Sequence, residues 1–286
     1  RGKVELRKER VDLADIVQNA VEAARPLIEQ RGHKLTVSIP ESPIRLDVDP
    51  TRLPQILLNL LNNAAKYTDV GGKIQLSANL EQDQVCIQVQ DNGIGISGDM
   101  LPRVVEPFAQ MDRSMERSEG GLGIGLTLVE RLVALHGGSV LAESDGPGKG
   151  SVFTVLLPLP MEDTHESAAP EYTHASRNGF ETAPQAGRIL IVDDNRDGAD
   201  SLAILLRMSG HVVRTVHDGL DALDAATSFE PEIVLLDIGL PRLNGYEVAR
   251  HIRKLKGGQN TLLVAMTGWG QKEDQRRSHE AGFDHH

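Results

Sequence analysis

The feature that most constrains this chain is a set of three spaced motifs in its first half. A glycine-patterned run, EGGLGIGL, occupies residues 119–126, and it follows DNGIG at residues 91–95 and NAAKY at residues 63–67. Closely spaced glycines let the backbone approach an anionic ligand and offer it amide donors. The apolar run from Leu122 to Leu135 predicts a helix whose N-terminus faces the same ligand. Together the motifs predict one nucleotide pocket in which phosphate lies against the glycine-rich backbone.

The composition excludes several classes of protein. The 286 residues are enough for about two domains, and no apolar run is long enough to cross a membrane. The formal net charge of -11, from 41 acidic and 30 basic residues, argues against a nucleic-acid partner, because phosphate neutralisation needs clustered Lys and Arg. The single cysteine, Cys86, excludes a disulfide framework within one chain and indicates a cytoplasmic setting. It lies in a strand-like run, which predicts a buried thiol.

Periodicity divides the chain into two predicted domains. Helical spacing covers residues 12–30 and 51–67, and strand-like runs cover residues 34–39, 44–48, 73–80, 84–90, 139–143 and 151–157. This pattern predicts an α/β sandwich in which helices cover one face of a mixed sheet. Four short β-rich runs at residues 188–192, 212–216, 233–236 and 262–266 alternate with helical patterns, which predicts a doubly wound parallel sheet. We therefore expect domains at residues 12–158 and 188–286, a flexible linker at residues 159–187, and a remnant of a preceding element at residues 1–11.

The three motifs resemble the N, G1 and G2 boxes of the ATP-binding domain of sensor histidine kinases, a branch of the superfamily that includes gyrase and Hsp90. Asn59, Asn63 and Lys66 are spaced to share one helix face, where Asn63 can give an oxygen to Mg²⁺ and Lys66 a positive charge to a triphosphate. The resemblance implies that Asp91 accepts a hydrogen bond from the adenine amine and that Tyr67 packs near the base. It also implies a flexible wall around the phosphates, made of Gly93, Gly95, Gly121, Gly123 and Gly125, and a mobile lid over residues 97–120.

Alternatives to this interpretation concern both residues and activity. Asp91 has the alternative of an Asx turn, and Tyr67 the alternative of simple core packing. ATPases of the gyrase or Hsp90 type place a glutamate, which activates water, one helical turn before the metal-binding asparagine. This chain has Asn59 at that position, and an amide cannot act as a base near neutral pH. Hydrolysis is therefore disfavoured, and a non-catalytic nucleotide-binding scaffold is the other alternative. Residues 148–151, GKGS, lack the Walker A interval and predict a hairpin turn.

The histidine that such kinases phosphorylate is expected outside this chain. In the family it lies on a helical dimerisation hairpin before the ATP-binding domain. The sequence begins at Arg1 and not at a methionine, so we expect the histidine upstream of Arg1. His165 mimics the spacing of the family's motif, but its disordered composition argues against an acceptor role. The expected partners are this histidine-containing dimerisation domain, in the same or a partner chain, and a downstream response regulator or phosphotransfer protein. We expect the parent to be a homodimer, with membrane tethering left open.

The second half of the chain predicts a cluster of carboxylates. Asp193 and Asp194 follow one predicted strand and Asp237 ends another, and ligands of open parallel sheets bind at the carboxyl ends of strands. Packed carboxylates repel one another unless a cation neutralises them, so the cluster implies Mg²⁺, which would also let a phosphoryl group approach Asp237. For Asp193 and Asp194 alone, helix capping is the alternative. Thr267 closes a further strand-like run and can hydrogen-bond a phosphoryl oxygen.

This cluster resembles the site of the flavodoxin-like response-regulator receiver domain. The resemblance implies that Asp237 is the phosphoacceptor. The family's phosphate-binding lysine, last strand and last helix would lie beyond His286, so we expect a truncated receiver domain. His286 aligns with the family's aromatic switch position, and both a signalling role and none are left open. The sequence thus predicts part of a hybrid sensor histidine kinase, which transfers the γ-phosphoryl of ATP to a histidine and then to Asp237 or to another receiver.

Overall fold

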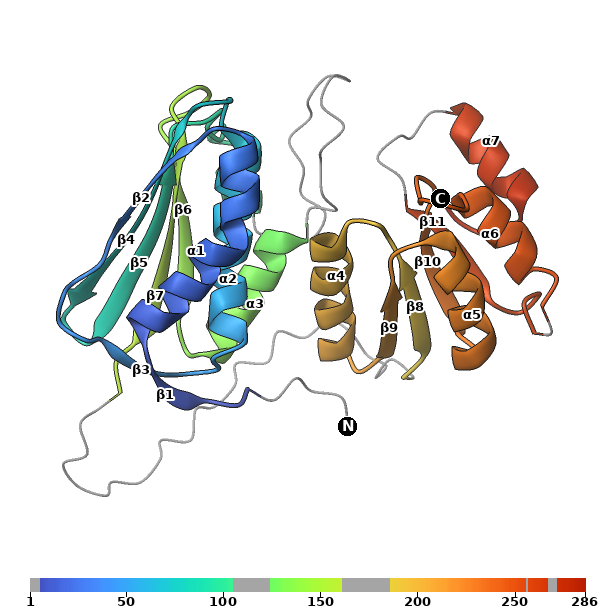
Figure 1. Ribbon diagram of the computed structural model, residues 1–286, viewed down its shortest axis with the longest axis horizontal. Helices are drawn as coiled ribbons and strands as arrows, with labels where there is room; N and C mark the ends of the chain where they lie inside the picture. The colour runs from blue at the N-terminus through green and yellow to red at the C-terminus, as the bar shows by residue number, and fades with distance from the viewer. Residues whose placement is uncertain (1–5, 105–123, 161–185, 256, 267–271) are drawn as a thin grey trace. The chain divides into compact units, whose positions relative to one another are not determined.

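The computed structural model describes residues 6–104, 124–160, 186–255, 257–266 and 272–286 (Figure 1). Among the described residues, one compact unit contains residues 6–104 and 125–160, and the other contains Ile124 and the residues from 186 onward. None of the helices in the described residues is long and apolar enough to span a membrane.

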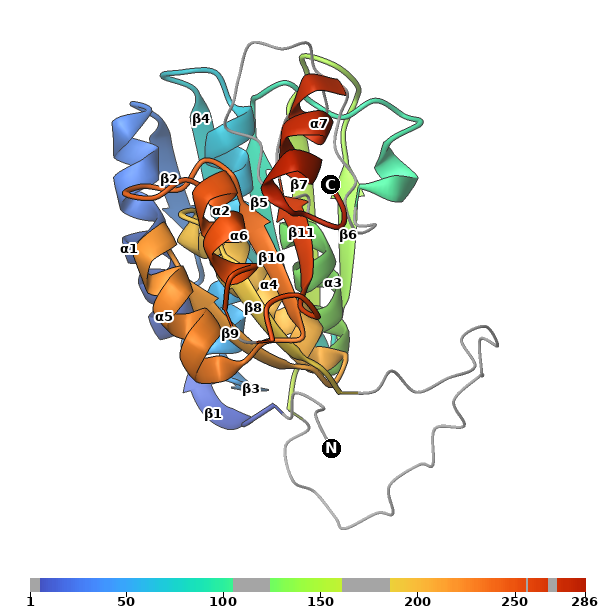
Figure 2. The ribbon, with the colours of Figure 1, turned by 90° about the vertical axis from the view of Figure 1, so that its right-hand side faces the viewer.

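The first unit is a two-layer α/β sandwich. Its elements are β1 (Glu9–Asp12), α1 (Leu13–Gln30), β2 (Lys34–Ser38), β3 (Arg45–Val48), α2 (Arg52–Tyr67), β4 (Lys73–Glu81), β5 (Gln84–Asp91), the 3-10 helix η1 (Leu101–Arg103), α3 (Gly125–Leu135), β6 (Ser139–Glu143) and β7 (Ser151–Pro158). The main sheet has the order β2-β4-β5-β7-β6, in which only β2 and β4 pair in parallel. Helices α1, α2 and α3 lie on one face of this sheet (Figures 1 and 2). The predicted sandwich with a mixed sheet is confirmed.

Alternation along the strands explains why the helices cover one face only. In β4, Ile74, Leu76 and Ala78 are 1% exposed or less, whereas the residues between them are partly or fully exposed. The apolar stripe of α2 packs onto the buried face through Leu53, Leu57, Leu60 and Leu61, and all four are 1% exposed or less. Cys86 is 3% exposed, as its strand-like surroundings predicted.

Two local features differ from the sequence-based expectation. The strand β3 was expected next to the other strands, but it pairs antiparallel with β1 in a separate two-stranded sheet. The apolar run that begins at Leu122 was expected to be helical throughout. In the described residues the helix α3 begins at Gly125, and Leu122 lies outside them.

The second unit is a parallel sheet with helices between its strands. Its elements are β8 (Arg188–Val192), α4 (Arg196–Met208), β9 (Val212–Val216), α5 (Gly219–Phe229), β10 (Ile233–Asp237), α6 (Gly245–Ile252), β11 (Leu262–Met266) and α7 (Lys272–Ala281). The strand order is β9-β8-β10-β11, and every pair is parallel. The doubly wound, flavodoxin-like fold is therefore confirmed. After α7 the chain forms a parallel bridge from His285 to Val264, beside β11.

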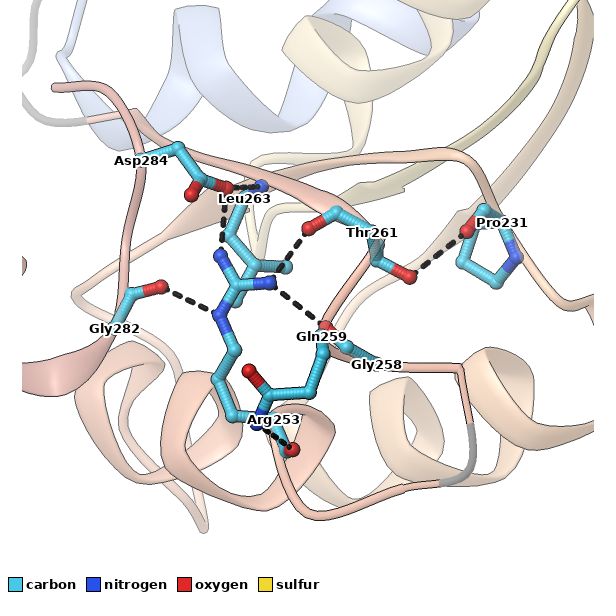
Figure 3. Close-up of polar contacts among 8 residues, drawn as sticks. All are labelled: Pro231, Arg253, Gly258, Gln259, Thr261, Leu263, Gly282 and Asp284. Atoms are coloured by element: carbon cyan, nitrogen blue, oxygen red, sulfur yellow. Dashed lines mark hydrogen bonds and ion pairs between the residues drawn. The ribbon is translucent and has the colours of Figure 1, made fainter.

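Arg253 fixes this last segment in place (Figure 3). Its Nε donates to the carbonyl of Gly282 at 2.7 Å, and its guanidinium also donates to the carbonyls of Gly258 and Thr261 at 2.7 and 2.6 Å. A further nitrogen forms an ion pair with Asp284 at 2.6 Å. One side chain therefore joins the end of α6, the loop before β11 and the segment after α7.

Candidate functional site

A pocket opens in the first unit between α2 and the loop that follows β5. Its wall is made of Asn63, Ala64, Tyr67, Asp91, Ile94, Gly95, Ile96, Met100, Val104, Leu126, Ser151 and Phe153. These residues come from α2, the end of β5 and its loop, the first turn of α3, and the start of β7. The pocket therefore collects residues from all three sequence motifs.

The four polar residues predicted on α2 divide into two groups. Asn63 and Tyr67 line the pocket, whereas Asn59 and Lys66 are partly buried and are not part of its wall. Tyr67 is 43% exposed, which rules out simple core packing for its ring. The Nδ2 of Asn59 donates to the carbonyl of Gln55 at 3.0 Å, and a Cβ on Gly125 would lie 3.0 Å from the Oδ1 of Asn59. Asn59 therefore faces the N-terminus of α3.

Asp91 is the buried anion of the pocket. It is 7% exposed, and its Oδ1 accepts from the backbone N–H of Gly93 at 2.8 Å, so the Asx turn considered above is present. Its Oδ2 accepts from the Oγ of Ser151 at 2.5 Å. Each carboxylate oxygen has two lone pairs, so these two bonds leave capacity for a ligand donor. The turn and a ligand-binding role are therefore compatible.

The glycines after β5 have a packing role that the sequence did not show. A Cβ on Gly93 would overlap the carbonyl oxygen of Tyr67, and Gly95 has φ +69 and approaches the carbonyl of Gly146 closely. The absence of a side chain at Gly93 and Gly95 lets the loop after β5 lie close to α2 and to the turn between β6 and β7. Gly125 is the first residue of α3, while Gly121 and Gly123 lie outside the described residues, as does most of the predicted lid.

Ser151 is a pocket residue that sequence reasoning missed. Residues 148–151 were interpreted only as a hairpin turn, and this turn does join the antiparallel strands β6 and β7. In the register of β5 and β7, however, Ser151 pairs with Asp91. The signal available in the sequence was a hydroxyl residue at the start of a strand, directly after a glycine turn. Only the strand pairing shows that it faces the carboxylate.

The second unit brings the three predicted aspartates together. Asp193 and Asp194 follow β8 and Asp237 ends β10, and one carboxylate oxygen from each lies within 4.8 Å of the others. The helix-capping alternative is wrong, because the cap of α4 is Asn195, whose Oδ1 accepts from the backbone N–H of Gly198. An all-oxygen set of ligands suits a hard divalent cation.

Electrostatics in this cluster support a cation. Burial raises the pKa of Asp193 to about 6, and the charges of Asp237 and Asp194 add to the effect, while a hydrogen bond from the backbone of Asn195 opposes it. Burial and the charge of Asp194 also raise the pKa of Asp237, against hydrogen bonds from the backbone of the next two residues. A bound cation would relieve the repulsion and hold the carboxylates ionised.

Several expectations fall outside the described residues or remain predictions. Thr267 lies outside them, although Met266, the residue before it, pairs with Asp237 in the register of β10 and β11. The predicted linker, including His165, also lies outside them except at its two ends. His286 is exposed, and its role stays a prediction.

Comparison with known families agrees with both units. Residues 48–161 match the family of histidine kinase-, DNA gyrase B-, and HSP90-like ATPases, and residues 189–286 match the response regulator receiver domain. The chain therefore contains an ATPase domain of this type followed by a receiver domain.

The similar curated proteins are sensor kinases. The chain is 31% identical to the autoinducer 2 sensor kinase/phosphatase LuxQ of Vibrio parahaemolyticus over 293 residues, covering 100% of this chain and 33% of LuxQ. It is 35% identical to the circadian input-output histidine kinase CikA of Synechococcus elongatus, covering 78% of this chain and 29% of CikA. It is 31% identical to the virulence sensor protein BvgS of Bordetella bronchiseptica, covering 99% of this chain and 24% of BvgS.

The predicted resemblance to hybrid sensor histidine kinases is confirmed by these two domains in one chain and by these homologues. The chain spans a third or less of the length of these relatives. The ATPase family implies that the first domain binds ATP.

Proposed function

We propose that ATP occupies the pocket between α2, α3 and the loop after β5, together with Mg²⁺. The observation that carries this proposal is the convergence of a buried carboxylate, Asp91, and an amide, Asn63, on one pocket wall. Asp91 can accept a hydrogen bond from the adenine amine, because both of its existing bonds leave lone pairs free. Tyr67, with 43% of its surface exposed, offers a ring face to the base.

The remaining residues of the first domain would position the triphosphate. Asn63 supplies a neutral oxygen ligand of the kind that Mg²⁺ prefers, and the metal, when bound, screens the charge of the phosphates. Lys66 follows on the same helix face and would approach the phosphates with its flexible side chain. Gly121 and Gly123 would expose backbone N–H groups to them, and the N-terminus of α3 at Gly125 faces the same charge.

Phosphoryl transfer is favoured over hydrolysis by Asn59. Its side chain is already a donor to the carbonyl of Gln55, and an amide cannot take a proton from water. The reactive nucleophile would therefore be supplied by another segment, a histidine on a dimerisation domain of the same or a partner chain. A parent homodimer and a downstream response regulator or phosphotransfer protein complete this proposal.

In the second domain, Asp237 would receive the phosphoryl group. One carboxylate oxygen of Asp237 bonds to phosphorus, and the bond from phosphorus to the donor nitrogen breaks as that nitrogen regains a proton. Asp193, Asp194 and Asp237 would hold Mg²⁺, and Thr267 would donate to a phosphoryl oxygen. The two domains would thus act in a two-component phosphorelay from ATP to histidine to aspartate.

Calorimetric titration with Mg-ATP tests the nucleotide site. Replacing Asp91 by Asn should weaken binding about 10- to 100-fold, because a hydrogen bond to a charged group contributes about 1.5–3 kcal/mol. Asn63→Asp should also weaken binding, because it places a negative charge near the phosphates. Asp83→Asn in the turn after β4 and Asn79→Asp on β4 make the same chemical changes at exposed positions away from the pocket. If all four variants bind Mg-ATP as tightly as the wild type does, the assignment of the nucleotide site is rejected.

Titration with Mg²⁺ alone tests the acidic cluster. Asp194→Asn should lower the affinity of the second domain at least about tenfold, because one of the three carboxylates is neutralised. Asp200→Asn, at an exposed position of α4, should leave the affinity unchanged. If both variants bind Mg²⁺ like the wild type, the cluster is not the metal site.

A scaffold that binds nucleotide without transferring phosphate is the alternative function. It would share the binding results above, so binding alone does not distinguish it. Transfer of radiolabelled phosphate from ATP to a histidine distinguishes the two functions.

A further inference from the structure

A buried polar junction lies at the opposite end of the two helices that line the pocket. The helices α2 and α3 are antiparallel neighbours, since Gly125 at the start of α3 lies beside Asn59 in the middle of α2, and His136 after the end of α3 lies beside Asp49 before the start of α2. At the other end, His136 follows α3 and Asp49 precedes α2. With 11 residues, α3 spans about 16 Å. The junction is therefore about one helix length from the pocket.

His136 links the two helices through both of its ring nitrogens. The backbone N–H of Asp49 donates to Nε2 at 3.0 Å, and Nδ1 lies 2.7 Å from the carbonyl oxygen of Leu132. Because Nε2 accepts, the proton must be on Nδ1, which donates to the carbonyl. The neutral tautomer with its proton on Nδ1 therefore fits both partners, whereas a proton on Nε2 would face the N–H of Asp49. The ring is 3% exposed, so no water can take over either bond easily.

The side chain of Asp49 extends this junction to the N-terminal segment. Its Oδ2 accepts from the backbone N–H of Arg7 at 2.9 Å, and its Oδ1 accepts from the N–H groups of Thr51 and Arg52 at 2.9 and 3.1 Å. Asp49 is 6% exposed. One buried residue therefore contacts the segment before β1, the first turn of α2 and, through His136, the end of α3.

The geometry points to a positioning role: we propose that Asp49 and His136 set the orientation of α3 against α2 and so couple the nucleotide pocket to the backbone at Arg7. Leu126, in the first turn of α3, lines the pocket, and Asn63 lies on α2, so a rotation of one helix against the other changes the pocket. The proposal rests on the proposed function, because nucleotide affinity is its readout. Apolar packing between the helices is the competing explanation of their orientation.

Variants of His136 test the first half of the proposal by calorimetric titration with Mg-ATP. His136→Ala removes both bonds and should weaken binding about 5- to 20-fold, within the range of couplings between sites. His136→Gln keeps an acceptor for the N–H of Asp49 and should restore the affinity to within about twofold of the wild type, as expected for one hydrogen bond retained. Ser139→Ala, an exposed change three residues further on, is the matched control.

Variants of Arg7 test the coupling to the N-terminal segment. Arg7→Pro removes the N–H that Asp49 accepts, whereas Arg7→Ala keeps it, so only the proline variant should weaken binding. The double variant Arg7→Pro with His136→Ala should bind no more weakly than His136→Ala alone, because the coupling is already lost. Additive losses would show independent effects and would overturn the coupling.

The outcomes separate this proposal from the function on which it rests. A wild-type chain that does not bind Mg-ATP overturns the proposed function. A wild-type chain that binds, with unchanged affinity in His136→Ala, overturns the junction alone and leaves apolar packing as the explanation. If His136→Ala does not fold, the comparison of His136→Gln with the wild type and of Arg7→Pro with Arg7→Ala still decides. Loss of affinity in the glutamine variant, or equal affinity in the two Arg7 variants, would then contradict the proposal.

Discussion

Replacing Ser151 by Ala tests the least expected contact of the nucleotide site. The hydroxyl of Ser151 donates to the Oδ2 of Asp91, and Ser151 is 8% exposed, so the substitution removes a donor from a buried carboxylate. The other oxygen keeps the N–H of Gly93, so Asp91 should stay close to its position. The substitution therefore changes the electrostatic environment of the Asp91 carboxylate more than it changes the position of that carboxylate.

The expected magnitude follows from the charge and the burial of Asp91. A hydrogen bond to a charged group contributes about 1.5–3 kcal/mol, and removing one partner leaves the other desolvated. We expect the free energy of unfolding of the first domain to fall by about 1.5–3 kcal/mol, since Asp91 is 7% exposed. About half of this loss should appear in nucleotide affinity, which corresponds to roughly a 3- to 12-fold weaker Kd. Ser151→Thr keeps the hydroxyl and should retain most of the affinity.

Urea unfolding and Mg-ATP titration of the same preparations provide the assay. Ser139→Ala, at an exposed position of β6, controls for the loss of a serine hydroxyl as such. We expect Ser151→Ala to lower both the free energy of unfolding and the affinity for Mg-ATP, and Ser139→Ala to change neither. Unchanged stability and unchanged affinity in Ser151→Ala would refute the role given to this hydrogen bond.

Other residues give further expected outcomes. Arg253→Gln should lower the unfolding free energy of the second domain by about 2–4 kcal/mol in urea unfolding, because three carbonyls and Asp284 lose a charged donor; no loss relative to the exposed control Arg250→Gln would contradict this. Mg²⁺ affinity of the acidic cluster should fall about tenfold per pH unit below about 6, because Asp193 must lose its proton before the ion binds. Calorimetric titration with Mg²⁺ at several pH values checks this by measuring both the affinity and the protons released. Burial, with a contribution from the charge of Lys8, lowers the pKa of His136 below 6.5, against the effects of Leu132 and Asp49. The unfolded chain then binds the proton first, so the first domain should lose stability as pH falls below about 6.5, and His136→Gln should remove this slope.

The fold could be predicted because the relevant signals are local. Alternation in β4 and the apolar stripe of α2 each depend on neighbours in the sequence, and both indicate which face is buried. The acidic cluster was also predictable, since Asp193 and Asp194 follow one short apolar strand, Asp237 ends another, and parallel strands bring their carboxyl ends to one edge.

The details of the nucleotide site depended on pairing between distant segments. Ser151 faces Asp91 only because β5 and β7 pair in one register, and the two residues are 60 positions apart. Asp49 and His136 are 87 positions apart and meet because α2 and α3 are antiparallel. Asn59 shares a helix face with Asn63 in the sequence, but α3 begins beside it, so it does not line the pocket. No local pattern carries this information.

The most direct test of the phosphorelay uses radiolabelled ATP. The chain is incubated with Mg-ATP labelled at the γ-phosphate and with a separately prepared sample of the histidine-containing dimerisation domain proposed above. The account predicts acid-labile label on that histidine, and loss of this label in Asp91→Asn but not in Asp83→Asn. An unlabelled histidine in the presence of a chain that binds Mg-ATP would contradict kinase activity and would support a nucleotide-binding scaffold.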